Sequence, residues 1–129
     1  MPDDPSIPDD ARLLRRVIPE WIVADENTNS KRVSSAAFCN STAEDGTEEG
    51  MSVFLEYILI DDARPATSVL VGYESNGLIA QTARWVRTWQ QGVVRDPIPE
   101  EIAHAQVMGP KNSNTRRKLA KIYEWIFIP

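Results

Sequence analysis

The apolar residues of this 129-residue chain lie in short blocks, each only a few residues long and separated by Pro-, Gly-, Asp- and Asn-containing stretches. Such blocks suit short strands and helices, and they are far below the roughly 20 residues of a membrane-spanning helix. Strand and helix patterns do not alternate regularly, which argues against a doubly wound α/β sheet. We therefore predict a single compact α+β domain, with a small, mostly antiparallel sheet and two or three helices.

The two most polar stretches set the domain organisation. Residues 1–10 hold four aspartates and three prolines without periodic apolar residues, so we predict a flexible acidic tail with nothing to pack. Residues 11–129 then form the domain, whose length suffices for one core. Within it, residues 40–50 (NSTAEDGTEEG) are small, polar and acidic, which predicts a mobile loop.

Local patterns predict the elements. Apolar residues at 13–18 have helical spacing, and Pro19 ends any helix there. Ser52 is a plausible N-cap for a helix over 53–60. The stretch 78–89 fits a helical face or a long strand, and its aromatic and β-branched residues favour the strand. The clearest helix is basic, with Asn112, Ser113 or Asn114 as its cap and Leu119, Ile122 and Ile126 on its apolar face. Shorter elements are predicted at 21–23, 33–38, 66–71, 93–94, 103–108 and 125–128.

Cysteine usage and the N-terminus both indicate a cytoplasmic protein. Cys39 is the only cysteine, so no internal disulfide forms, and we expect it to serve packing. The first residues lack the basic and apolar regions of a signal peptide. One histidine and one cysteine exclude a structural zinc site. A carboxylate-rich magnesium or calcium site stays open because the chain has nineteen acids, but no spacing supports one, and we predict neither metal nor cofactor.

The charge distribution points to an anion site near the C-terminus. The net charge of −5 argues against nucleic-acid binding by bulk electrostatics, although residues 111–121 hold five basic residues and no acid. Lys111, Arg116 and Arg117 lie near the start of the predicted helix, where the helix dipole disfavours cations. An anionic ligand or an acidic partner segment would offset that cost, so the three residues are candidate ligand-binding residues. The alternative is a solvated basic helix face.

His104 is the first candidate for chemistry. The chain has no Walker loop, GxGxxG, HExxH, paired CxxC or GxSxG motif. His104 is the only imidazole, lies between two alanines and follows three nearby acids, so it is a candidate general acid or base. The alternative is a partly buried histidine that one backbone carbonyl satisfies.

Two serines and an arginine form the second candidate group. A nucleophilic Ser34 or Ser35 would need His104 as its base, with Asp61, Asp62 or Asp96 as the orienting acid. Alternatively, Arg32 beside these serines can hold a phosphate or a carboxylate. The simpler interpretation is that the serines end a strand and that Arg32 is solvated.

The four tryptophans are best interpreted as core residues, with one of Trp85 and Trp89 exposed at a protein interface. Tryptophan is enriched among the residues that dominate binding energy at interfaces. Both residues are therefore candidate interface residues.

Four short segments also carry a family resemblance: SSAAF (34–38), MSV (51–53), GVVRDP (92–97) and HAQVMG (104–109). In this order, and followed by a basic helix, they resemble a set of small bacterial proteins without an assigned function. The resemblance covers the chain from about residue 13 onward and implies no fold, activity or cofactor. It places Arg32, Ser34, Ser35, Asp96 and His104 in the shared blocks. The related proteins have a second lysine at Pro110, which weakens a lysine-based anion site.

Two functions follow from these observations. The leading one is a cytoplasmic binding module that recognises a protein partner or an anionic ligand. The alternative is a small enzyme that acts on a phosphate-bearing or nucleotide-like substrate, with His104 as acid or base and Ser35 or Arg32 positioning the substrate. A nucleic-acid binder acting through the C-terminal helix fits least well, and the sequence does not define the oligomeric state. Convergence of Arg32, Ser35 and His104 on one pocket would favour the enzyme.

Overall fold

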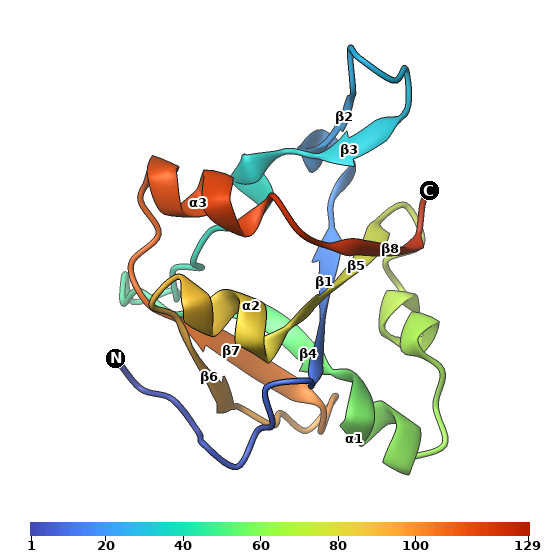
Figure 1. The fold of residues 1–129 in the computed structure, drawn as a ribbon. Coiled ribbons are helices and arrows are strands. Elements are labelled where there is room, and N and C mark those ends of the chain that lie inside the picture. The colour runs from blue at the N-terminus through green and yellow to red at the C-terminus, as the bar shows by residue number, and fades with distance from the viewer.

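A six-stranded antiparallel sheet organises the chain in the computed structural model, which describes residues 1–129 (Figure 1). The strand order is β6-β7-β4-β1-β5-β8, and each neighbouring pair is antiparallel. Its strands are β1 (Arg12–Val17), β4 (Met51–Leu55), β5 (Gly77–Thr82), β6 (Gly92–Arg95), β7 (His104–Met108) and β8 (Glu124–Phe127). A separate two-stranded sheet contains β2 (Ile22–Ala24) and β3 (Lys31–Val33).

Short helices connect the strands. The α-helices are α1 (Glu56–Asp61), α2 (Ala83–Thr88) and α3 (Ser113–Leu119), and the 3-10 helices are η1 (Pro19–Trp21), η2 (Ser35–Ala37) and η3 (Ala66–Leu70). In Figure 1, α2 and α3 lie on one side of β1, and the segment from α1 to η3 lies on the other. These elements confirm the predicted α+β class. No helix has the length and apolarity needed to cross a bilayer.

The central strand β1 corrects the helix that we expected over 13–18. Leu13, Leu14 and Val17 are all buried, because β1 lies between β4 and β5 and both of its faces are covered. A strand that is buried on both faces places apolar residues at consecutive positions, and this pattern overlaps with helical spacing. The buried apolar residues of the chain form one continuous cluster around this strand.

Two expected elements each divide into a strand and a helix. The predicted helix over 53–60 is β4 followed directly by α1, so Ser52 lies inside a strand and caps nothing. The stretch 78–89 is β5 followed by α2, and the hydroxyl of Thr82 accepts a hydrogen bond from the N–H of Trp85 at 3.1 Å. The basic helix α3 begins after Asn112, one of the three predicted caps, whose side chain accepts a hydrogen bond from the N–H of Thr115. It ends at Leu119, so Ile122 and Ile126 lie outside the helix to which their spacing assigned them.

The N-terminal segment packs against the domain, contrary to the expectation that residues 1–10 have nothing to pack. Ile7 is fully buried. The N–H of Asp4 donates to the carbonyl of Val93, and the N–H of Val93 donates to Asp3 Oδ1, each at 2.8 Å. Arg87 on α2 pairs with Asp3 at 3.1 Å. The N-terminal acidic segment therefore pairs with an arginine that is distant in sequence, and local sequence patterns do not predict such a contact.

Gly92 allows this docking, and its replacement by alanine is expected to lower the free energy of unfolding by about 2 kcal/mol. An added Cβ would overlap the carbonyl oxygen of Pro2 and press on Asp3 Cβ. Urea unfolding measures the cost. In a chain that lacks residues 2 and 3 the same substitution should cost far less, since the overlap is gone. Equal costs in the two backgrounds would contradict this account.

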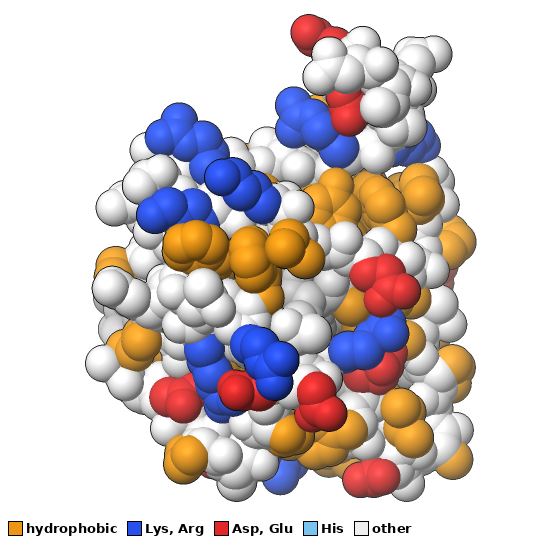
Figure 2. All heavy atoms as spheres, in the orientation of Figure 1, with side chains coloured by type: hydrophobic (Ala, Val, Ile, Leu, Met, Phe, Trp, Pro, Cys, Tyr) orange, Lys and Arg blue, Asp and Glu red, His pale blue; other side chains and the backbone are white.

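Surface charge is unevenly distributed. Figure 2 shows Lys and Arg side chains gathered over α3 and beside the β2–β3 sheet, with a band of hydrophobic side chains next to them. The chain thus presents a basic face built from segments far apart in sequence.

Residues 40–50 form an irregular loop that a bridge between Thr42 and Glu48 closes.

Candidate functional site

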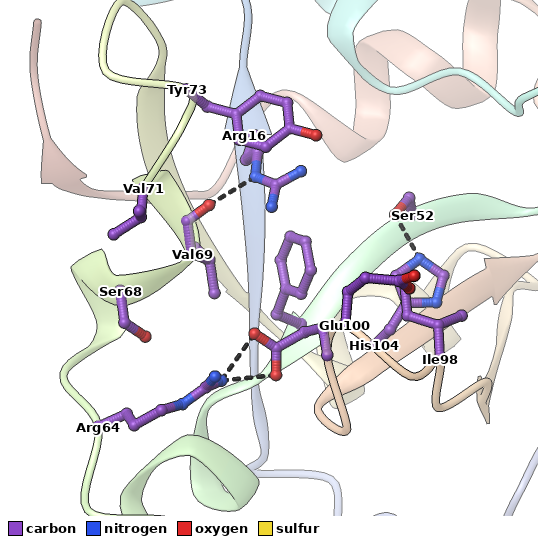
Figure 3. Close-up of a pocket in the computed structure, with 12 residues that line it drawn as sticks. Arg16, Ser52, Arg64, Ser68, Val69, Val71, Tyr73, Ile98, Glu100 and His104 are labelled. Carbon is purple, nitrogen blue, oxygen red and sulfur yellow. Dashed lines mark hydrogen bonds and ion pairs between the residues drawn. The ribbon is translucent and has the colours of Figure 1, made fainter.

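The main cavity lies where the two central strands β1 and β4 move apart. β1 and β4 pair only at Leu13–Leu55 and Leu14–Phe54. Beyond this point a cavity of about 580 Å³ lies between β1, β4, β7, η3 and the loop before β7 (Figure 3). A volume of this size is typical of small-molecule sites.

Arg15 links the two strands through its side chain at the point where their backbone pairing has ended. Its Nη1 donates to the carbonyl of Ser52 at 2.9 Å, and its Nη2 donates to the carbonyl of Ala37 at 2.8 Å. The guanidinium lies 5.2 Å from the ring centroid of Trp21. No carboxylate lies within ion-pair distance, and burial lowers the pKa of Arg15. This residue holds the strand edge and η2 in place beside the cavity.

Arg16 is the cation that lines the cavity itself. Its guanidinium carbon lies 3.7 Å from the ring centroid of Tyr73 and 4.6 Å from that of Phe54. Nε donates to the carbonyl of Val69 at 2.7 Å (Figure 3). Its two Nη groups make no other hydrogen bond of good geometry to the protein, and no carboxylate lies within ion-pair distance, although the side chain of Tyr73 and the more distant charge of Glu101 both favour the charged guanidinium. Burial is the main cause that lowers the pKa of Arg16.

His104 lies on another wall of the cavity and bonds at both ring nitrogens. Nε2 is 2.7 Å from Ser52 Oγ. Nδ1 is 2.9 Å from the carbonyl oxygen of Asp96 and 3.2 Å from its Oδ2. The Phe54 ring and the imidazole pack in a T-shaped arrangement, with centroids 5.8 Å apart. The imidazole therefore lies between a serine hydroxyl and a carboxylate.

The remaining wall is more acidic. Arg64 Nη2 donates to both carboxylate oxygens of Glu101, at 2.6 and 2.5 Å, and this contact raises the pKa of Arg64. Glu100 also lines the cavity. Ser68 Oγ, which is buried at the same cavity, has no hydrogen-bond partner. The cavity thus has a cationic end at Arg16 and hydrogen-bonding groups facing it.

The predicted residues Arg32, Ser34 and Ser35 lie elsewhere. They line a separate cavity of about 390 Å³ together with Arg117, Lys121 and Tyr123. His104 is absent from this cavity, so Arg32, Ser35 and His104 do not converge. Ser34 instead caps η2 by accepting a hydrogen bond from the N–H of Ala36. The serine beside His104 is Ser52, which the sequence analysis placed at a helix cap.

The predicted cluster of Lys111, Arg116 and Arg117 does not gather around one cavity either. Lys111 Nζ donates to Asn40 Oδ1 and to the carbonyls of Val107 and Gly109, the latter two at 2.9 and 3.1 Å. Arg116 Nη1 donates to the carbonyl of Lys111 at 2.6 Å. These two cations are therefore occupied by protein groups, and of the three only Arg117 reaches the second cavity.

Lys111 gives the stability of the protein a specific pH dependence. Burial, with a smaller contribution from the charge of Arg15, lowers the pKa of Lys111 to about 8 from 10.5. Between these values the unfolded chain binds more protons, so the free energy of unfolding should rise by about 1–2 kcal/mol from pH 8 to 10.5. Urea unfolding across this range measures the rise. Lys111→Met should lack this contribution, and parallel curves for the two chains would contradict it.

Trp85 and Trp89, the predicted interface residues, are both half-buried. Their rings pack edge to face with centroids 5.4 Å apart. Trp85 Nε1 donates to the carbonyl of Leu119 at 3.1 Å, and Lys118 Nζ lies 4.9 Å from the Trp89 ring centroid. These contacts fasten α2 to α3, and an interface role stays a prediction.

The chain matches no protein-family model, no curated protein and no solved structure. No group of three or more His, Cys, Asp and Glu side chains is arranged to hold a metal ion. Sequence reasoning identified His104 and Asp96 but missed Ser52 and Arg16, whose signal is the strand pattern that places them on one face.

Proposed function

We propose that the protein binds a small anionic ligand, through a carboxylate or phosphate group, in the cavity between β1 and β4. The observation that carries this proposal is the state of Arg16. Its guanidinium is held between two aromatic rings, lines the cavity and lacks an acidic partner. The lone free cysteine, Cys39, supports a reducing cytoplasm as the place where this binding occurs.

The clamped guanidinium suits an anion in both charge and shape. A partly buried cation without a carboxylate in ion-pair contact is unfavourable, and a bound anion would reduce that cost. The aromatic rings fix the plane of the guanidinium, and Nε is already occupied by Val69. The two Nη groups therefore present a fork, which matches the paired oxygens of a carboxylate or a phosphate.

The other walls restrict the rest of the ligand. Ser52 offers its hydroxyl oxygen as an acceptor and the unpartnered hydroxyl of Ser68 lies at the same cavity, whereas Glu100 repels negative charge. A ligand that fits both walls has its anionic group at Arg16 and neutral or donor groups toward Glu100. A metabolite-sized molecule of this kind fits the cavity volume of about 580 Å³.

Thermal unfolding in inorganic phosphate tests the proposal. At tenfold excess over Kd, binding to the folded state contributes about 1.4 kcal/mol, which raises Tm by about 3 to 6 °C relative to sodium chloride of equal ionic strength. Arg16→Lys keeps the charge but removes the fork, and it should abolish this increase. Arg32→Lys, in the second cavity, is the matched control and should retain it. No increase in the parent chain, or an increase that Arg32→Lys alone removes, would overturn the proposal.

A further inference from the structure

The hydrogen bonds of His104 fix which ring nitrogen carries its proton. Nδ1 lies 2.9 Å from the carbonyl oxygen of Asp96, and a carbonyl oxygen only accepts hydrogen bonds. Nδ1 is therefore the protonated nitrogen of the neutral ring, and Nε2 presents its lone pair. Because Ser52 Oγ lies 2.7 Å from Nε2, the hydroxyl donates to it. A serine that donates to a neutral histidine is the starting arrangement of a serine nucleophile.

Asp96 supplies the charge that His104 needs when it takes up a proton. Its Oδ2 lies 3.2 Å from Nδ1 and accepts a hydrogen bond from Gln106 Nε2 at 2.8 Å. Gln106 is held in turn, because its Oε1 accepts a hydrogen bond from the N–H of Gly50 at 2.7 Å. The carboxylate is thus fixed beside the ring, where it stabilises an imidazolium.

The strand register places this pair on the same sheet face as the anion site. Phe54 pairs with His104 on β7 and with Leu14 on β1. Residues two positions apart on a strand share a face, so Ser52, His104 and Arg16 project to one side of the sheet. Figure 3 shows Ser52 and His104 on one wall of the cavity and Arg16 beside Tyr73 on another.

We propose that Ser52 is a catalytic nucleophile with His104 as its general base, and that the protein hydrolyses carboxylic esters that bear an anionic group. The anionic group would be held by Arg16, so this inference rests on the proposed function for its substrate class. Other serines near cations, such as Ser34 and Ser35, have no imidazole in reach, since they line the second cavity.

The reaction proceeds in two displacements. Ser52 Oγ attacks the ester carbonyl carbon and its proton passes to His104 Nε2. The ester C–O bond then breaks, and the leaving alkoxide takes that proton from Nε2, which leaves an acyl group on Ser52. A water molecule attacks the acyl carbon and gives a proton to Nε2. The bond from the acyl carbon to Oγ breaks, Oγ recovers the proton, and the carboxylic acid is released.

Covalent labelling with phenylmethanesulfonyl fluoride tests the nucleophile without relying on the anion site, because this reagent is neutral. Intact-mass spectrometry should show one adduct on the parent chain. Ser52→Ala should abolish it, and His104→Gln should slow it at least ~100-fold. Ser35→Ala is the matched control and should label at the parent rate, while circular dichroism melts establish that each variant is folded. No adduct, or an adduct that persists in Ser52→Ala, overturns the inference.

Two ester substrates test the substrate class. The parent chain should hydrolyse 4-nitrophenyl hemisuccinate with a higher kcat/KM than 4-nitrophenyl acetate, and Arg16→Lys should remove the difference while labelling of Ser52 persists. Asp96→Asn alters a positioning residue, so it should lower kcat about tenfold or more with KM unchanged. Equal kcat/KM for both esters in the parent chain overturns the anionic substrate class. Absence of phosphate binding in the parent chain, with labelling of Ser52 intact, instead contradicts the proposed function alone.

Discussion

Replacing Phe38 by alanine is expected to lower the free energy of unfolding by about 4 kcal/mol, the largest effect that we predict for a single substitution. Phe38 is fully buried and is among the largest of the fully buried side chains. It directly follows η2, whose residue Ala37 accepts the hydrogen bonds of Arg15. Truncation leaves a cavity in the layer that supports this arginine. Urea unfolding with the linear extrapolation measures the loss.

Phe127→Ala is the matched control for this substitution. Phe127 has the same side chain, but it lies on the edge strand β8 and is 41% exposed. Its truncation removes less apolar surface from a covered environment and leaves no enclosed cavity, so we expect a loss of about 1 kcal/mol. A similar loss for both variants would show that Phe38 is not held in the core.

Replacing Arg15 by alanine is expected to cost about 3 kcal/mol. The substitution leaves the carbonyls of Ala37 and Ser52 without their donor and removes packing against Trp21. Each buried acceptor that loses its partner costs about 1–3 kcal/mol, and the gain from removing a buried charge offsets part of the sum. Urea unfolding again measures the change.

Arg15→Lys separates the shape of the guanidinium from its charge. A single ammonium cannot donate to two carbonyls in the fixed geometry of the fork, so lysine should recover only part of the loss. If Arg15→Lys were as stable as the parent chain, the paired hydrogen bonds that link β4 to η2 would not be the source of the stability that this arginine provides. A fully stable Arg15→Ala variant would contradict the bridge altogether.

The sequence predicts a capped helix start better than it predicts the strand-to-helix joins or the end of a helix. The start of the basic helix at Asn112 was predicted, because a cap is a local signal, but the apolar spacing extended the helix too far, since it ends at Leu119. The join at Thr82 was missed, although a threonine that can cap the following turn was present. Leu55 joins β4 to α1 without a side-chain cap, so no local signal marks that boundary.

The candidate site was only partly predictable, for a related reason. His104 and Asp96 stand out as an imidazole and a nearby acid, but the partner of His104 depends on the register between β4 and β7. A sequence gives no register, so we considered Ser34 and Ser35 as the nucleophile and Ser52 only as a helix cap. The pair Arg15 and Arg16 is equally ambiguous until β1 is known to be a strand, which sends adjacent side chains to opposite faces.

The central claim is that Arg16 binds an anion, and an NMR titration of the 15N-labelled protein with inorganic phosphate tests it most directly. The Nε–H of Arg16 donates to Val69, so its resonance reports on this guanidinium alone. We predict that this resonance shifts saturably, together with the amides of Ser52 and Tyr73, while the resonances of Arg32 and Arg117 do not move. Saturating shifts confined to Arg32 and Arg117, with Arg16 unchanged, would contradict the claim.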